Sequence, residues 1–141
     1  MLPGNIKLNT STDESVCIEQ LVGEFNPHEE LTIQSYNITR KSMTHETVTM
    51  TRSTSCKDFV LLEFEDQSNL IITPDNQIYQ PDTGEWVRSS HIKCGTNVLT
   101  PAGQIQLIKT HTIRNNMSER VYNLNLTGHS CYFANNVLIK C

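Results

Sequence analysis

The chain has 141 residues, a net charge of −4 and 37% hydrophobic residues, a composition typical of a folded globular domain rather than a disordered or fibrous chain. Its acidic balance offers no basic surface for nucleic acid. No apolar run is long enough for a membrane-spanning helix or a signal peptide. The length predicts a single domain over residues 1–141.

Cysteine usage points to a reducing environment. The number of cysteines is odd and no C-x-x-C spacing occurs, which indicates neither a disulfide framework nor a zinc ribbon. We therefore expect free thiols and a cytoplasmic location. The five cysteines are Cys17, Cys56, Cys94, Cys131 and Cys141.

The sequence pattern predicts an all-β protein. Near the N-terminus, residues 12–22 have a capping signal followed by a helical pattern that stops at Gly23. A further short helical turn is expected at residues 89–92. Only two alanines occur in the chain, which argues against other helices. Alternating or apolar runs of strand length, separated by Pro-, Asn- and Gly-containing turn signals, follow at residues 47–51, 59–64, 70–73, 121–126 and 137–139.

Five stretches, taken in chain order, resemble the sequence blocks of the Hint family, which includes inteins, bacterial intein-like domains and hedgehog autoprocessing domains. The last stretch, VYNLNLTGHSCYFANNVLIKC, is the most specific of them. The resemblance covers nearly the whole chain and leaves no room for an endonuclease insert. The five stretches are residues 2–10, 15–23, 70–78, 84–100 and 121–141.

This resemblance implies a horseshoe-like β-structure with pseudo-two-fold symmetry, one or two short helices, and both termini in a central cleft. It implies autocatalytic self-processing: an acyl shift at the N-terminal junction, then cleavage, acyl transfer or splicing of the flanking segments, in a single turnover. The bacterial intein-like class fits best, and some of its ciliate members adjoin ubiquitin-like domains. The expected partners are therefore segments of the chain's own precursor, ubiquitin-like ones included, and the domain is expected to act as a monomer.

The first group of site residues surrounds position 1. The family uses a Cys or Ser there, whereas this chain has Met1, and a thioether has no ionisable proton with which to form a thioester. As written, the chain is expected to be inactive at that step. Thr73 matches the family Thr, and Asn76 stands where the family has His. Both are expected to be exposed polar side chains that orient the scissile amide.

The second group lies in the last block. Asn123 stands where Asp is common, and a one-residue adjustment places His129, in place of Ser130, on the family His. Lys140 replaces the penultimate His and Cys141 replaces the terminal Asn, so Asn cyclisation is not available at the chain end.

No cofactor is required by such chemistry, but zinc is a candidate ligand of the cleft. Thiolate and imidazole together favour Zn²⁺. The candidate ligands are His129, Cys131 and Cys141. None of them has zinc-finger spacing, so the fold would have to assemble the site.

Two other interpretations stay open. The departures at Met1, Asn76, Lys140 and Cys141 favour a degenerate, non-catalytic Hint-like domain that binds a partner or a metal, and an unrelated β-barrel that binds a ligand is the other. Taken singly, site residues also have structural interpretations. Thr73 can open a β-turn, and Asn76 can be a left-handed turn residue. His129 can be an ordinary loop histidine, and Cys131 a core thiol.

Overall fold

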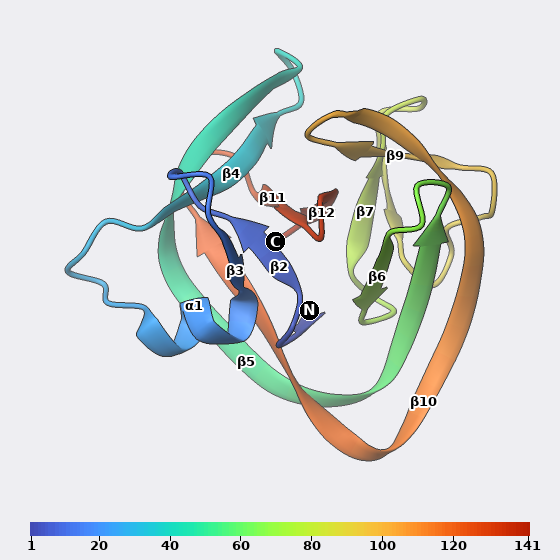
Figure 1. The fold of residues 1–141 in the computed structure, drawn as a ribbon, viewed down its shortest axis with the longest axis horizontal. Helices are drawn as coiled ribbons and strands as arrows, with labels where there is room; N and C mark the ends of the chain where they lie inside the picture. The colour runs from blue at the N-terminus through green and yellow to red at the C-terminus, as the bar shows by residue number, and fades with distance from the viewer.

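Two very long strands organise the structure, a computed structural model that describes residues 1–141. β5 (Ser42–Phe64) and β10 (Gly103–Leu126) pair antiparallel along most of their lengths. Together they form a curved ribbon that bends around both chain ends (Figure 1). The predicted strands at residues 47–51 and 59–64 are thus two parts of one strand, because the polar residues between them continue the pairing instead of turning.

The remaining elements are short. The only helix is α1 (Ile18–Glu24), and the structure contains no helix that could span a membrane. The other strands are β1 (Leu2–Pro3), β2 (Lys7–Asn9), β3 (Ser15–Cys17), β4 (Thr32–Asn37), β6 (Asn69–Ile72), β7 (Gln77–Gln80), β8 (Glu85–Arg88), β9 (Asn97–Thr100), β11 (Cys131–Ala134) and β12 (Val137–Lys140). The all-β prediction is confirmed.

The two halves of the ribbon have equivalent neighbours. β4 pairs with the first half of β5, and β9 pairs with the first half of β10, each through a hairpin. β6 continues the sheet at the second half of β5, and β1 does so at the second half of β10. This arrangement agrees with the pseudo-two-fold horseshoe expected from the sequence.

The predicted helix at residues 12–22 is wrong in its first half. β2 and β3 pair from Lys7–Cys17 to Asn9–Ser15, and Asp13 takes a positive φ of 62° in the turn between them. The Thr10 amide donates to the Glu14 carbonyl at 2.9 Å, which closes that turn. Strand pairing therefore overrides the capping signal, and the helix begins at Ile18. The helical turn expected at residues 89–92 is a turn in the structure.

The hairpin of β11 and β12 brings the C-terminus into the interior. Its two-residue loop consists of Asn135 and Asn136, whose φ angles are 46° and 65°. Two positive φ values are the requirement of a type I′ turn, and Asn tolerates them better than most residues. The Asn135 side chain also accepts a hydrogen bond from the Lys7 amide at 2.8 Å, which ties the hairpin to β2.

The core is formed by residues from nearly the whole length of the chain. Twenty-two buried residues, from Leu2 to Ile139, make one hydrophobic cluster. A smaller cluster lies on the other face of the β11–β12 hairpin and consists of Tyr79, Cys131, Phe133 and Leu138. Successive residues of that hairpin alternate between the two clusters, as strand geometry requires.

Truncation of a core side chain should be far more costly than truncation of an exposed one. Leu62 is fully buried in the larger cluster, so Leu62→Ala should lower the free energy of unfolding by about 2–5 kcal/mol. Met117 is 80% exposed, and Met117→Ala should change it by about 0.5 kcal/mol or less. Chemical denaturation measures both values. Equal losses in the two variants would contradict the assignment of the core.

Candidate functional site

The nitrogen of residue 1 is held between two side chains. The Met1 α-amine donates to Thr73 Oγ1 at 2.6 Å and to Asn76 Oδ1 at 2.5 Å. The Met1 carbonyl accepts a hydrogen bond from the Thr73 amide at 3.0 Å. Residue 1 is therefore fixed on both sides of its Cα, and any peptide bond preceding it would lie against Thr73 and Asn76.

Thr73 and Asn76 are buried, contrary to the expectation that they are exposed. The two residues are 4% and 8% accessible, respectively. They sit in the turn between β6 and β7, where the Asn76 amide donates to the Thr73 carbonyl at 3.2 Å. Ser89, in the turn that follows β8, stabilises this turn: its Oγ donates to the Thr73 carbonyl at 2.7 Å and its amide to the Asn76 carbonyl at 2.8 Å. Thr73 is thus both a turn opener and an acceptor for residue 1.

Asn76 also reaches the other chain end. Its Nδ2 donates to the Lys140 carbonyl at 3.1 Å, while its Oδ1 accepts from Met1. Asn76 does not have a positive φ, so the left-handed turn interpretation is wrong. One amide group therefore connects the nitrogen of residue 1 with the carbonyl of the last peptide bond.

A cavity of about 450 Å³ surrounds these groups. It lies between the two chain ends, which Figure 1 marks near the centre of the horseshoe. The cavity brings together five of the seven catalytic candidates predicted from the sequence. Its lining residues are Met1, Arg52, Asp75, Asn76, Gln77, Asn123, Lys140 and Cys141.

Strand register explains why Asn123 and Arg52 face residue 1. Leu2 pairs with Tyr122, so Met1 lies next to Asn123, and Asn123 pairs in turn with Arg52 on β5. Asn123 Oδ1 accepts from Tyr132 Oη at 2.7 Å and from the Leu124 amide at 2.8 Å. These bonds fix the amide, which cannot titrate as the Asp of the family would.

Three groups at the site were not found by sequence reasoning. Arg52 has only a strand pattern around it, which gives no functional signal. In the sequence, Tyr132 cannot be told from an ordinary core aromatic residue. It is fully buried, and in addition its hydroxyl orients Asn123. Burial raises the pKa of Tyr132 well above its ordinary value, so the hydroxyl stays a donor. Ser89 acts only through the Thr73 turn.

Lys140 contributes its backbone carbonyl to the site, whereas Cys141 lines the cavity. The Lys140 Nζ lies 5.8 Å from the centre of the Trp86 ring, on the face of the smaller cluster, and its carbonyl faces Asn76. Lys140 therefore offers the site a carbonyl in place of an imidazole. Cys141 packs against the larger cluster and lines the cavity, and burial raises its pKa to about 12.

The structure does not bring the predicted zinc ligands together. Cys131 lies on the opposite face of the hairpin from Cys141, where its thiol donates to the Tyr36 carbonyl at 3.3 Å. His129 is in the bend after β10 and does not line the cavity. No group of three His, Cys, Asp or Glu side chains is placed to hold a metal ion. The zinc site stays a prediction of the sequence.

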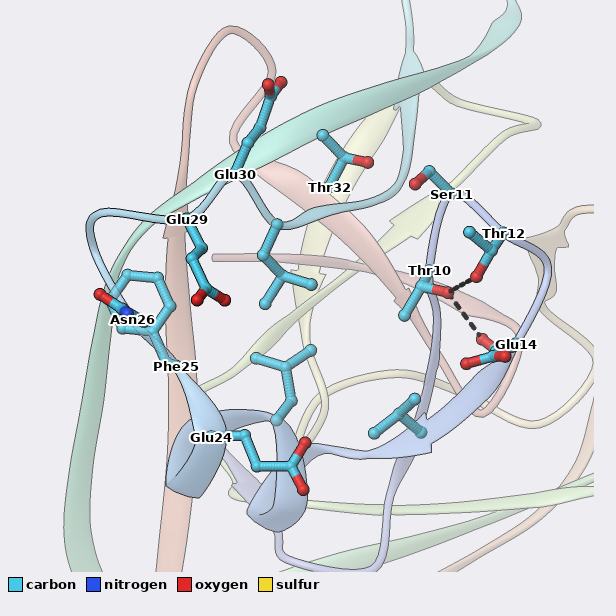
Figure 2. Close-up of a pocket in the computed structure, with 13 residues that line it drawn as sticks. Thr10, Ser11, Thr12, Glu14, Glu24, Phe25, Asn26, Glu29, Glu30 and Thr32 are labelled. Carbon is cyan, nitrogen blue, oxygen red and sulfur yellow. Dashed lines mark hydrogen bonds between the residues drawn. The ribbon is translucent and has the colours of Figure 1, made fainter.

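A second cavity, of about 390 Å³, lies beside α1 and contains none of the predicted site residues. Figure 2 shows carboxylates around it, including those of Glu24, Glu29 and Glu30. The Thr10 hydroxyl forms hydrogen bonds with the Thr12 hydroxyl and the Glu14 carbonyl. No cysteine or histidine lines it. It therefore offers acidic and hydroxyl groups but no strong nucleophile.

Burial makes the amine of residue 1 a weaker base than usual. Desolvation lowers the pKa of the Met1 α-amine from 8.0 to about 6, against a smaller opposite effect of Asp75. Near pH 7 the amine is mostly neutral, and it still has N–H groups for Thr73 and Asn76. A neutral amine is a nucleophile and a base.

The low pKa predicts a pH-dependent stability. Between pH 6 and 8 the unfolded chain binds more protons than the folded one, so the free energy of unfolding should rise with pH across this window, by on the order of 2 kcal/mol. Acetylating the α-amine removes the titration and should remove this rise. Denaturation at several pH values measures it in both forms; an equal rise in the acetylated protein would contradict the assignment.

The architecture is similar to that of solved intein-like structures. No protein-family model and no curated protein sequence matches the chain. The solution structure of a bacterial intein-like domain from Clostridium thermocellum matches with a TM-score of 0.84 at 19% identity, covering 100% of this chain and 99% of that one. A DnaB intein from Synechocystis sp. PCC 6803 matches with a TM-score of 0.83 at 16% identity, covering 99% and 96%.

An intein from a hyperthermophile is similar as well, with a TM-score of 0.80 at 15% identity, covering 99% of this chain and 98% of that one. The similarity runs over nearly the whole length of each chain, so it includes the horseshoe ribbon. The chain therefore has the Hint fold of intein-like domains, as the sequence predicted.

Proposed function

We propose that this chain is an autocatalytic self-processing domain that acts on the peptide bond preceding residue 1. The observation that carries the proposal is that Thr73 Oγ1 and Asn76 Oδ1 both lie within hydrogen-bond distance of the residue 1 nitrogen, which as a peptide nitrogen would donate its single N–H to one of them. Groups that hold the amide nitrogen of a scissile bond can twist the amide out of conjugation, and loss of resonance makes its carbonyl easier to attack.

The chemistry requires a nucleophile at position 1. With Cys there, the thiol would attack the preceding carbonyl, the C–N bond would break, and the acyl group would move to sulfur as the freed amine takes up a proton. Met1 cannot do this because its sulfur carries no proton. The chain as written therefore lacks the first step but keeps the site that would support it.

The substrates would be flanking segments of the same precursor. The resemblance to ciliate intein-like domains favours ubiquitin-like segments, and the domain would act as a monomer in a single turnover. All five cysteines are free, which agrees with a reducing, cytoplasmic setting.

A second candidate function is a degenerate domain that binds a partner without processing it. Met1 and Lys140 favour this alternative, because one removes the nucleophile and the other directs its side chain to Trp86 instead of the cavity. Restoring the nucleophile separates the two.

Restoration of a thiol at position 1 should restore cleavage. We expect Met1→Cys, carrying a short upstream peptide, to release that peptide when dithiothreitol is added, because external thiolate attacks a thioester. The matched Met1→Ala chain has the same upstream peptide and no nucleophile, so it should stay intact. Mass spectrometry of both samples identifies the products. Release at the same rate from both chains would refute the acyl shift.

The hydroxyl of Thr73 should be needed for that cleavage. In the Met1→Cys background, Thr73→Val keeps the side-chain shape and removes the acceptor of the residue 1 nitrogen, so we expect the rate to fall at least about 10-fold. Thr73→Ser keeps the hydroxyl and should retain most of the rate. If Val and Ser gave the same rate, Thr73 would have only its turn-forming role.

A further inference from the structure

The peptide bond between Lys140 and Cys141 has the surroundings of a second reaction site. Its carbonyl oxygen accepts a hydrogen bond from Asn76 Nδ2 at 3.1 Å. The residue on the other side of the bond, Cys141, carries a thiol, and Cys141 and Met1 line the same cavity. A nucleophile, a donor at the carbonyl oxygen and a base are thus collected around one peptide bond.

We propose that Cys141 cleaves the peptide bond on its own N-terminal side. Its sulfur attacks the Lys140 carbonyl carbon through a five-membered ring, the C–N bond breaks, and residues 1–140 are left as a thioester on Cys141 Sγ. An external thiol or water then takes the acyl group and releases any segment that begins with Cys141. This reaction needs no nucleophilic side chain at position 1, so it is independent of the function proposed above.

Asn76 would stabilise the charge that develops on the Lys140 oxygen. Donors of an oxyanion hole lie about 2.7–3.1 Å from the oxygen they stabilise, and Asn76 Nδ2 meets this distance. The orientation of the amide is fixed, because its Oδ1 is bound to the Met1 nitrogen. Burial of Asn76 strengthens the interaction, since water does not compete for the donor.

The thiol proton needs an acceptor, because burial keeps Cys141 protonated at neutral pH. The neutral Met1 amine is the base at this cavity; it takes the proton from Sγ as the sulfur bonds to the carbonyl carbon, and gives it to the departing Cys141 nitrogen. The net result moves one proton from sulfur to the new amine, with no other reactant. The charged or titratable groups that act on the Met1 amine or line its cavity are Arg52, Cys56, Asp75, Lys140 and Cys141.

Other groups nearby are poorly placed for these roles. The Lys140 ammonium lies over Trp86 on the opposite face of the hairpin. Cys131 is on that face too, and its thiol is engaged with the Tyr36 carbonyl. Cys141 is therefore the thiol that the fold presents to the Lys140 carbonyl.

The test uses the full chain with Met1 unchanged and a short peptide added after Cys141. Incubation with mercaptoethanesulfonate near pH 7.5 should give residues 1–140 as a thioester and a peptide that begins with Cys141, both identified by mass. Cys141→Ala should give neither product, and Cys141→Ser should react at least 10-fold more slowly. Cys94→Ala is the matched control: that cysteine is exposed and lies outside the cavity, so its loss should leave the rate unchanged.

Two further measurements test the donor and the base. Asn76→Asp keeps an acceptor for residue 1 and removes the donor to the Lys140 carbonyl, so the rate should fall at least 10-fold. With a free amine the rate should rise with a midpoint near pH 6 as the amine loses its proton, and acetylation should abolish the rise. Cleavage at another bond, an equal rate in Cys141→Ala, or no effect of Asn76→Asp would overturn the inference. If the Lys140–Cys141 bond is never cleaved while the Met1→Cys chain cleaves at its N-terminal junction, this inference is overturned and the proposed function stands.

Discussion

The hydrogen bonds of one buried amide, that of Asn76, set the geometry of the whole site. A buried polar side chain must have its donors and acceptors satisfied, because an unpaired one costs about 1–3 kcal/mol. Here the partners are the nitrogen of residue 1 and the carbonyl of residue 140. These partners come from opposite ends of the chain, so the satisfied amide keeps both ends within one cavity.

The long ribbon makes this convergence possible. β1 reaches the centre by pairing with the second half of β10, and β12 reaches it by pairing with β7. The turn that follows β6 carries Thr73 and Asn76 to the same place. Three segments remote in sequence therefore meet where the horseshoe closes, and each is held by backbone pairing. Strand register therefore brings the three segments together, and the Asn76 amide then fixes the two chain ends relative to each other.

Sequence reasoning identified the all-β fold and five of the catalytic candidates that line the cavity, because the family blocks mark positions along the chain. It did not reveal that β5 is one strand, since residues 52–58 are too polar to be recognised as a continuation. It also missed the strand at Ser15–Cys17, where pairing with β2 outweighs a local capping signal. His129 and Lys140 show a different limit: an aligned position does not say which way a side chain points. For Arg52 and Tyr132, only the fold reveals that they contribute to the site.

The low pKa of the residue 1 amine bears on the direction of any acyl shift in this site. Once an acyl group has moved from nitrogen to a sulfur at position 1, the released amine lies beside the thioester. A protonated amine could not attack it, but burial keeps this amine mostly neutral near pH 7. Its hydrogen bonds to Thr73 and Asn76 also hold it in place, so in the proposed reaction the return to the amide would be fast. The thioester would therefore be a minor species in rapid equilibrium, and net cleavage would depend on an acceptor that intercepts it. Under the proposed function, such a site would favour acyl transfer to a thiol or amine that reaches the cavity over slow hydrolysis.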